Sequence, residues 1–92
     1  MFVSVQFSIY PLREKHLSPA ISRVVEIIKG FGLPVETGLM SSTTYGESKV
    51  VFKAFKRVYD EVSLASHVAI IMTLSNACPL PEKTRESLKR SV

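Results

Sequence analysis

The sequence has 92 residues, which is enough for one small domain and too few for two. Hydrophobic residues make up 46% and charged residues 22%, values that exclude a disordered or low-complexity chain. The net charge of +4 permits an anionic ligand but does not require nucleic acid. No apolar run reaches the ~18 residues of a membrane span, and the N-terminus lacks the basic start of a signal peptide. We therefore expect no membrane insertion.

Cysteine and histidine are too sparse for a disulfide or a zinc site. Cys78 is the only cysteine in the sequence, and no cluster of Cys and His residues accompanies it. A lone cysteine without a Cys-x-x-Cys partner predicts a structural side chain in a reducing compartment. We therefore expect a cytoplasmic protein without a metal.

The first half of the chain predicts a strand followed by a helix. Residues 2–10 alternate between apolar and polar side chains, as in a half-buried strand, and Pro11 is expected to end it because proline cannot donate to a strand ladder. Ser18 and Pro19 are typical of a helix start, apolar residues then recur at helical spacing, and Gly30 is expected at the helix end.

The second half predicts a hairpin, a longer helix and a last strand. Residues 35–40 and 42–45 are short extended segments, expected to pair as a hairpin. Residues 46–48 predict a turn with a helix cap at its last position. Residues 49–63 carry an apolar stripe with a period of 3.6 residues, and residues 68–75 alternate again as a strand.

This order of elements predicts an α+β fold, the ferredoxin-like βαββαβ sandwich. We expect a four-stranded antiparallel sheet in the order 4-1-3-2 with two helices on one face, because this keeps both crossovers right-handed. Residues 1–81 are expected to form this single domain. The charged residues 82–92 are expected to be a tail or a short C-terminal helix.

Two helices on one face leave the other face of the sheet uncovered, and we call it the open face. From the alternation of the strands we expect it to carry Ser4, Gln6, Ser8 and Tyr10, Ile71, Thr73 and Ser75, and Ser42, Thr43 and Thr44, with Ala69 and Tyr45 as further candidates. These side chains are mostly polar but uncharged, whereas a solvated sheet face usually carries Lys, Glu and Arg. One interpretation is a contact between subunits. The other is a pocket in which hydroxyl and amide groups orient a small heterocycle against Tyr10. The two interpretations are compatible.

The remaining features do not form a catalytic site. His16 and His67 have no second histidine or carboxylate pair at a useful spacing, so they are expected to be surface residues. The sequence has no phosphate-binding glycine loop and no nucleophile elbow. RNA-recognition modules with this order of elements carry a basic-Gly-aromatic run on the third strand, which residues 42–46 lack. The sequence therefore predicts neither an enzyme nor a nucleic-acid partner.

Three strings resemble the small thiamine-binding proteins of the YkoF-like family. Residues 7–12 (Phe-Ser-Ile-Tyr-Pro-Leu) resemble its first strand, residues 42–47 (Ser-Thr-Thr-Tyr-Gly-Glu) its third strand and helix entry, and residues 74–79 (Leu-Ser-Asn-Ala-Cys-Pro) the end of its last strand. The match runs through nearly the whole of residues 3–80. The resemblance implies a ferredoxin-like fold, assembly through sheet faces, binding of thiamine or its hydroxymethylpyrimidine moiety, and no catalysis.

The resemblance also implies a ligand site on the open face, near the ends of the first and last strands. A pyrimidine needs hydrogen-bond partners for its ring nitrogens and amino group, and an aromatic or apolar wall. The residues expected to supply them are Ser8, Tyr10, Thr43, Thr44 and Ser75, with Gln6 and Asn76 as additions and Glu36 or Glu47 as counter-charge for the thiazolium cation.

The predicted function is non-enzymatic binding of thiamine or hydroxymethylpyrimidine, as a ligand and with no cofactor, by a soluble carrier or a protein of uptake or salvage. The resemblance predicts a cytoplasmic homodimer or homotetramer formed through sheet faces. The alternative is a ferredoxin-like regulatory or protein-interaction module whose open face serves only oligomerisation.

Overall fold

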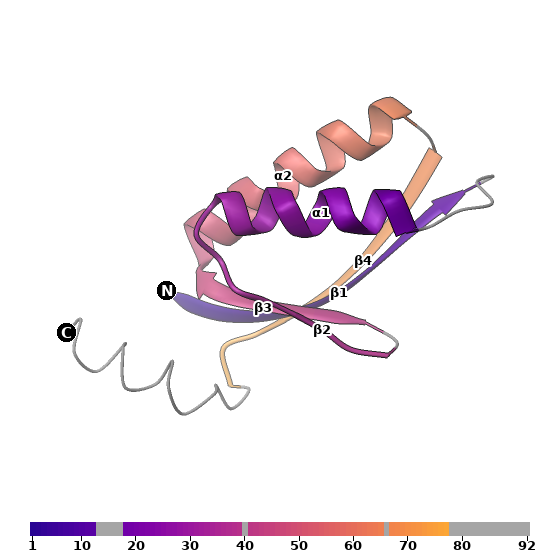
Figure 1. Cartoon of the computed structure of the whole chain (residues 1–92). Helices are drawn as coiled ribbons and strands as arrows, with labels where there is room; N and C mark the ends of the chain where they lie inside the picture. Colours follow the sequence, from indigo (N-terminus) through magenta and orange to yellow (C-terminus); the bar gives the residue numbers. More distant parts are fainter. Residues whose placement is uncertain (13–17, 40, 66, 78–92) are drawn as a thin grey trace.

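The structure is a computed structural model that describes residues 1–12, 18–39, 41–65 and 67–77 (Figure 1). The elements follow one another as β1 (Phe2–Leu12), α1 (Ser18–Gly30), β2 (Val35–Thr37), β3 (Ser42–Glu47), α2 (Ser48–Ala65) and β4 (His67–Ser75). This is the predicted βαββαβ order. The predicted tail at residues 82–92 lies outside the described residues.

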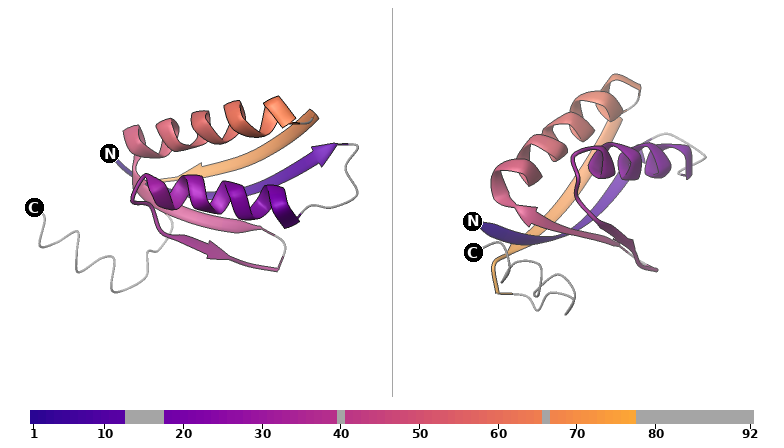
Figure 2. Two further views of the ribbon diagram at one scale, coloured as in Figure 1. Left: turned by 45° about the horizontal axis from the view of Figure 1, so that its top comes forward. Right: turned by 60° about the vertical axis from the view of Figure 1, so that its left-hand side comes forward.

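The four strands form one antiparallel sheet in the order β2-β3-β1-β4, which confirms the predicted topology. Both helices pack on the same face of this sheet, α1 over the β2–β3 side and α2 over the β4 side (Figure 2). The core lies between the two layers and consists of Val3, Val5, Phe7, Ile9, Val24, Ile27, Ile28, Leu33, Val51, Ala54, Phe55, Val58 and Val62. At its centre the rings of Phe7 and Phe55 meet edge to face, with centroids 5.0 Å apart.

The first strand is longer than predicted, because Pro11 does not end it. β1 continues to Leu12, and Pro11 lies opposite Val68 in the β1–β4 register. The pairing with β3 stops at Phe7, so the later part of β1 has only β4 as a neighbour. Proline occurs in such edge strands, where a position that faces away from the neighbouring strand needs no N–H for the ladder.

The predicted turn at residues 46–48 is also wrong. Gly46 and Glu47 are the last residues of β3, opposite Val3 and Phe2, and α2 begins at once with Ser48. A side chain at Gly46 would collide with the buried side chain of Leu33. This glycine therefore makes room for core packing, which the sequence pattern alone does not distinguish from a turn.

The other element boundaries differ from the prediction by small amounts. The helices were expected at residues 18–30 and 49–63, and the structure has them at Ser18–Gly30 and Ser48–Ala65. The last strand begins one residue early, at His67, which was expected in the preceding connection. β2 is the largest difference, because it ends at Thr37 and the chain then turns, with Gly38 N–H donating to the Ser41 carbonyl at 2.8 Å.

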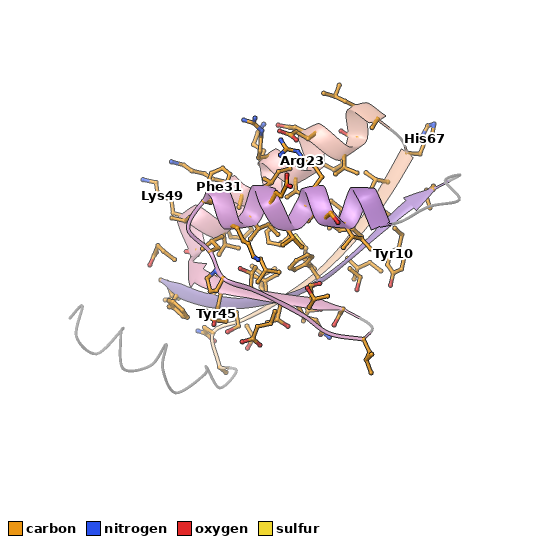
Figure 3. The ribbon with its side chains drawn as sticks, viewed as in Figure 1. Tyr10, Arg23, Phe31, Tyr45, Lys49 and His67 are labelled. Carbon is orange, nitrogen blue, oxygen red and sulfur yellow. The ribbon has the colours of Figure 1, made fainter. Side chains whose placement is uncertain are left out.

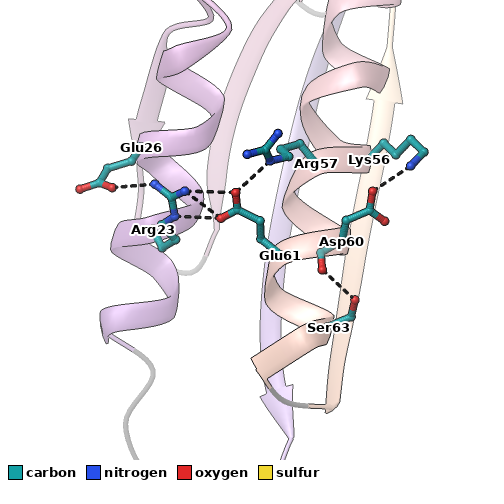
Figure 4. Close-up of polar contacts among 7 residues, drawn as sticks. All are labelled: Arg23, Glu26, Lys56, Arg57, Asp60, Glu61 and Ser63. Atoms are coloured by element: carbon teal, nitrogen blue, oxygen red, sulfur yellow. Dashed lines mark hydrogen bonds and ion pairs between the residues drawn. The ribbon is translucent and has the colours of Figure 1, made fainter.

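An ion-pair network joins the outer sides of the two helices (Figure 4). Arg23 of α1 lies 2.8 Å from the Glu61 carboxylate of α2 and 3.2 Å from that of Glu26, and Arg57 also reaches Glu61 at 2.8 Å. The hydrogen bonds from Arg57 and Arg23 lower the pKa of Glu61 below its usual value. The bonds to Glu26 and Glu61 raise the pKa of Arg23. This network lies on the side of α2 that faces α1.

Candidate functional site

The open face carries most of the side chains that were expected there. The strand register arranges these side chains in four rows across the sheet. The first row holds Tyr45, Ser4 and Ser75, and the second holds Glu36, Thr43, Gln6 and Thr73. The third row pairs Ser8 with Ile71, and the fourth pairs Tyr10 with Ala69. Gln6 donates from Nε2 to Ser41 Oγ at 2.8 Å, which ties the middle row to the β2–β3 connection. On this face β1 contributes no charged side chain, and the charged side chain that β3 contributes is Glu47 at its end, opposite Phe2.

The placement of Ser42 and Thr44 on the open face is wrong. Thr44 lies opposite Val5 and Ser42 opposite Phe7, so both share the helix-covered face with core residues. Thr44 is 0% exposed, and its hydroxyl finds no hydrogen-bond partner within the described ranges. Only Thr43 of the three consecutive hydroxyl residues belongs to the open face, because successive side chains of a strand point to opposite sides.

The predicted site residues do not gather in one place. β1 and β4 are antiparallel, so the end of β1 at Tyr10 lies opposite Ala69, while the end of β4 at Ser75 lies opposite Ser4. Tyr10 lies six residue steps along β1 from Ser4, roughly 20 Å at the usual rise per residue. The expectation that the ends of the first and last strands adjoin is therefore wrong.

At the Ser75 end of the sheet, two of the predicted polar groups already have partners. The Glu47 carboxylate pairs with the N-terminal ammonium of Met1. The Ser75 hydroxyl accepts a hydrogen bond from the Ala77 N–H at 3.0 Å, and Asn76 is exposed between them. These groups lie at the opposite end of β1 from Tyr10. Tyr45, which is the neighbour of Ser4 in the sheet, marks that end, and Figure 3 shows it far from Tyr10.

A pocket of about 270 Å³ opens at the Tyr10 end of the sheet, and we call it the wedge pocket. It arises because β1 and β3 pair only as far as Phe7 and Ser42 and then diverge, while α1 covers the gap. The residues that line it are Phe7, Ser8, Ile9, Tyr10, Ile21, Val24, Val25, Thr37, Gly38, Leu39, Ser41 and Ser42. Ser8 and Tyr10 are thus the two predicted site residues that it includes.

The lining of the wedge pocket combines apolar walls with hydroxyl groups. Val24, Val25 and Ile21 of α1 form one wall, and the hydroxyl-bearing residues come from β1 and the β2–β3 hairpin. Beyond Phe7, the backbone groups of β1 that point toward β3 have no strand partner in the described part of the sheet. An unpaired strand edge offers both N–H donors and C=O acceptors to a ligand.

The sequence patterns missed the contributions of α1 and the hairpin to this pocket. Val24 and Val25 were part of an apolar helix stripe, and Thr37 and Ser41 were ordinary positions of a short hairpin. Their meeting depends on where β3 stops pairing with β1, and no local sequence signal marks that point. Among the described residues, no group of three or more His, Cys, Asp or Glu side chains gathers where a metal ion would bind.

Comparison with known proteins assigns the chain to a family. The model of the YKOF-related family matches residues 2–81, so the chain belongs to this family. No curated protein matches the sequence. No helix in the described ranges is long and apolar enough to cross a membrane.

Several solved structures share the fold. A hypothetical protein from Methanocaldococcus jannascii superposes with a TM-score of 0.77 at 24% identity, covering 98% of this chain and 95% of that one. A protein from Thermotoga maritima, provisionally assigned to thiamine biosynthesis or salvage, gives 0.75 at 20% identity, covering 98% and 100%. A domain of unknown function from Bacillus cereus gives 0.70 at 20% identity, covering 91% and 86%. At these identities the likeness concerns the fold alone.

Proposed function

We propose that this chain binds thiamine or its hydroxymethylpyrimidine moiety in the wedge pocket, without converting it. Membership of the YKOF-related family supports a thiamine-related role, as does the provisional assignment of the Thermotoga maritima neighbour to thiamine biosynthesis or salvage. The proposed location of the ligand rests on the residues that line the wedge pocket. The wedge pocket holds Ser8 and Tyr10 from the predicted set, and it adds walls that the open face lacks.

One observation carries the proposal: the unpaired edge of β1 borders an apolar pocket. An aminopyrimidine presents ring nitrogens that accept hydrogen bonds beside an amino group that donates them, so it complements the alternating N–H and C=O groups of a free strand edge. The apolar side chains of α1 and the ring of Tyr10 would cover the two faces of the heterocycle. The hydroxyls of Ser8, Ser41 and Ser42 would complete the polar contacts.

For the cationic thiazolium ring of thiamine, we propose Glu36 as the counter-charge. Its row on the open face continues through Thr43 to Gln6, and Gln6 bonds to Ser41, which lines the wedge pocket. Glu47 is the weaker candidate, because it pairs with the N-terminal ammonium and lies opposite Phe2 at the far end of β1. The proposed site therefore uses Ser8, Tyr10 and Glu36, with Gln6 and Thr43 beside them, and leaves out Thr44, Ser75, Asn76 and Glu47.

The family membership and the Thermotoga maritima neighbour also support a proposal for the cellular role. A binding protein of this kind would serve as a cytoplasmic carrier in thiamine uptake or salvage, and a single cysteine in the sequence fits a reducing compartment. Assembly through the open face would bring the uncharged side chains of two subunits together. Incubation of the protein with thiamine, followed by chemical analysis, should return the ligand unchanged.

The test is a calorimetric titration with thiamine, thiamine phosphate and hydroxymethylpyrimidine. We expect saturable binding of at least one of them, and a dissociation constant raised about five- to tenfold by Ser8→Ala, the effect of one lost hydrogen bond. Ser75→Ala is the matched control, since it removes the same hydroxyl from the other end of the sheet and should leave the affinity unchanged. Flat titrations with folded protein would favour the regulatory or interaction module. Equal weakening by both variants would contradict the proposed location.

A further inference from the structure

The two helices carry more positive than negative charge, and the excess is left without partners. Lys and Arg side chains number two in α1 and four in α2, against one and two acidic side chains. All of these acidic groups are paired: Glu26 and Glu61 with arginines, and Asp60 with Lys56. The helix lysines that have no ion pair in the described part of the chain are Lys29, Lys49 and Lys53.

These unpaired lysines lie at the same end of the helix layer. Lys29 is in the last turn of α1, and Lys49 is in the first turn of α2. The two helix ends are neighbours, because Leu33, just after α1, lies close against Gly46, just before α2. Figure 3 shows Phe31 and Lys49 at this end. We call this surface the basic end, and it consists of Lys29, Phe31, Lys49, Phe52, Lys53 and Lys56.

An exposed phenyl ring lies among the lysines of α2. Four positions of this helix follow the spacing i, i+3, i+4, i+7, which places their side chains on one side. They are Lys49, Phe52, Lys53 and Lys56. The buried residues of α2 occupy the other side of the helix, and Phe52 is 57% exposed. The outer side of α2 therefore combines an apolar ring with three cations.

The position of Lys49 is unfavourable in the absence of a partner. It lies in the first turn of α2, and that turn holds no acidic residue. The partial positive charge at a helix N-terminus repels a cation and attracts an anion, so acidic side chains are normally preferred there. A negatively charged partner would relieve this repulsion and would also neutralise the unpaired Lys29 and Lys53.

We propose that the basic end binds the surface of an anionic phospholipid membrane, with the ring of Phe52 at the level of the headgroups. Clusters of four or more basic residues on a helix are typical of segments that bind anionic lipids. Lysine side chains can lay their apolar stems beside the ring while their ammonium groups reach the headgroups. Both helices stay packed on the sheet in this arrangement. The wedge pocket opens at the Tyr10 end of the sheet, so the inference does not depend on the thiamine proposal.

The type of cation favours lipid over an acidic protein as the partner. Arginine binds a fixed carboxylate through two parallel hydrogen bonds, whereas lysine is a flexible point charge. Arg23 and Arg57 are both engaged with Glu61 within the chain, and the cations of the basic end are all lysines. A bilayer presents its negative charge as a surface potential, which acts on each lysine without requiring a fixed geometry.

Sedimentation with lipid vesicles tests the binding. We expect the protein to bind vesicles of equal parts phosphatidylserine and phosphatidylcholine, and to bind pure phosphatidylcholine at least about tenfold more weakly. Added salt should release it from the mixed vesicles. Lys53→Ala should weaken binding about fivefold, and Lys49→Ala combined with Lys53→Ala about 20- to 30-fold, because each lysine near such a surface contributes about fivefold.

Thr73→Glu is the matched control for Lys53→Ala. It lowers the net charge by the same single unit, but Thr73 is an exposed residue of the open face, on the other side of the sheet from the helices. We expect it to change vesicle binding less than about twofold. Equal binding to both kinds of vesicle, or an unchanged affinity in the double lysine variant, would overturn the inference. Binding of polyglutamate but not of the anionic vesicles would overturn it in favour of an acidic protein.

A tryptophan at position 52 reports whether this ring reaches the headgroups. The sequence contains no tryptophan, so Phe52→Trp introduces a single fluorescent reporter. We expect its emission to move to shorter wavelength with the mixed vesicles, because the indole ring leaves water for the membrane interface. Tyr10→Trp, at the other end of the sheet, is the control and should keep its emission (Figure 3). An unchanged emission in Phe52→Trp, or a shift in Tyr10→Trp alone, would contradict the proposed contact.

Discussion

Replacing Thr44 with valine should stabilise the protein. The Thr44 side chain is fully buried between Val5 and Val35 on the core face of β3, and its hydroxyl has no partner within the described ranges. A buried hydroxyl without a hydrogen bond costs about 1–3 kcal/mol by mutational measures. Valine keeps the β-branched shape and removes that cost. We expect the free energy of unfolding to rise by about 1 kcal/mol, which corresponds to a melting temperature about 4–8 °C higher for a domain of this size.

Urea and thermal unfolding followed by circular dichroism measure this change. Thr43→Val is the matched control: the neighbouring residue undergoes the same substitution but lies half-buried on the open face, so we expect a change within about 0.5 kcal/mol. Thiamine affinity should be the same in Thr44→Val as in the wild type, because Thr44 is outside the lining of the wedge pocket. A loss of about 1 kcal/mol or more in Thr44→Val would show that the hydroxyl has a partner and would refute the reasoning.

Two further substitutions test the packing of β3 and the ion pairs between the helices. Gly46→Ala should lower the free energy of unfolding by about 1–3 kcal/mol, because the new methyl group meets Leu33. Gly30→Ala is the control: open space surrounds that position, so the free energy of unfolding should not fall. Equal losses for the two variants in urea unfolding would contradict this packing. Hydrogen bonds from Arg57 and Arg23 lower the pKa of Glu61, so its contribution to stability is complete above the unfolded pKa of about 4.3 and is lost as the pH falls through the lower folded value. Glu61→Gln should therefore flatten the decline in melting temperature below about pH 4.3. Parallel curves for the wild type and Glu61→Gln would contradict the role of the network.

The fold could be predicted from the sequence because its elements have strong periodic patterns. The alternation in β1 and β4 and the stripe in α2 each fix a type of element and a buried side, and six such elements in this order leave few topologies. The errors at Pro11 and Gly46 have one cause. Both residues usually interrupt a strand, but here the strand continues because of its surroundings. At Pro11, β1 has no β3 neighbour, and at Gly46 the side chain of Leu33 occupies the space that a larger residue would fill.

The candidate site was less predictable, because it depends on register and on where pairing stops. The run from Ser42 to Thr44 offers three hydroxyls in sequence, but a shift of one residue sends a side chain to the opposite face. Antiparallel pairing likewise separates Tyr10 from Ser75, although both belong to strings that resemble the same family. The wedge pocket adds Val24, Val25 and Thr37 from elements whose sequences show only ordinary helix and strand patterns.

The most direct test of the central claim is a nuclear magnetic resonance titration of the labelled protein with hydroxymethylpyrimidine and with thiamine. Binding in the wedge pocket predicts that the largest amide shifts fall on residues 8–10, 37–39 and 41–42 and on the first turns of α1. Amides around Ser4, Glu47 and Ser75, at the far end of the sheet, should change little. Shifts confined to that far end, or no shifts with either ligand, would contradict the account.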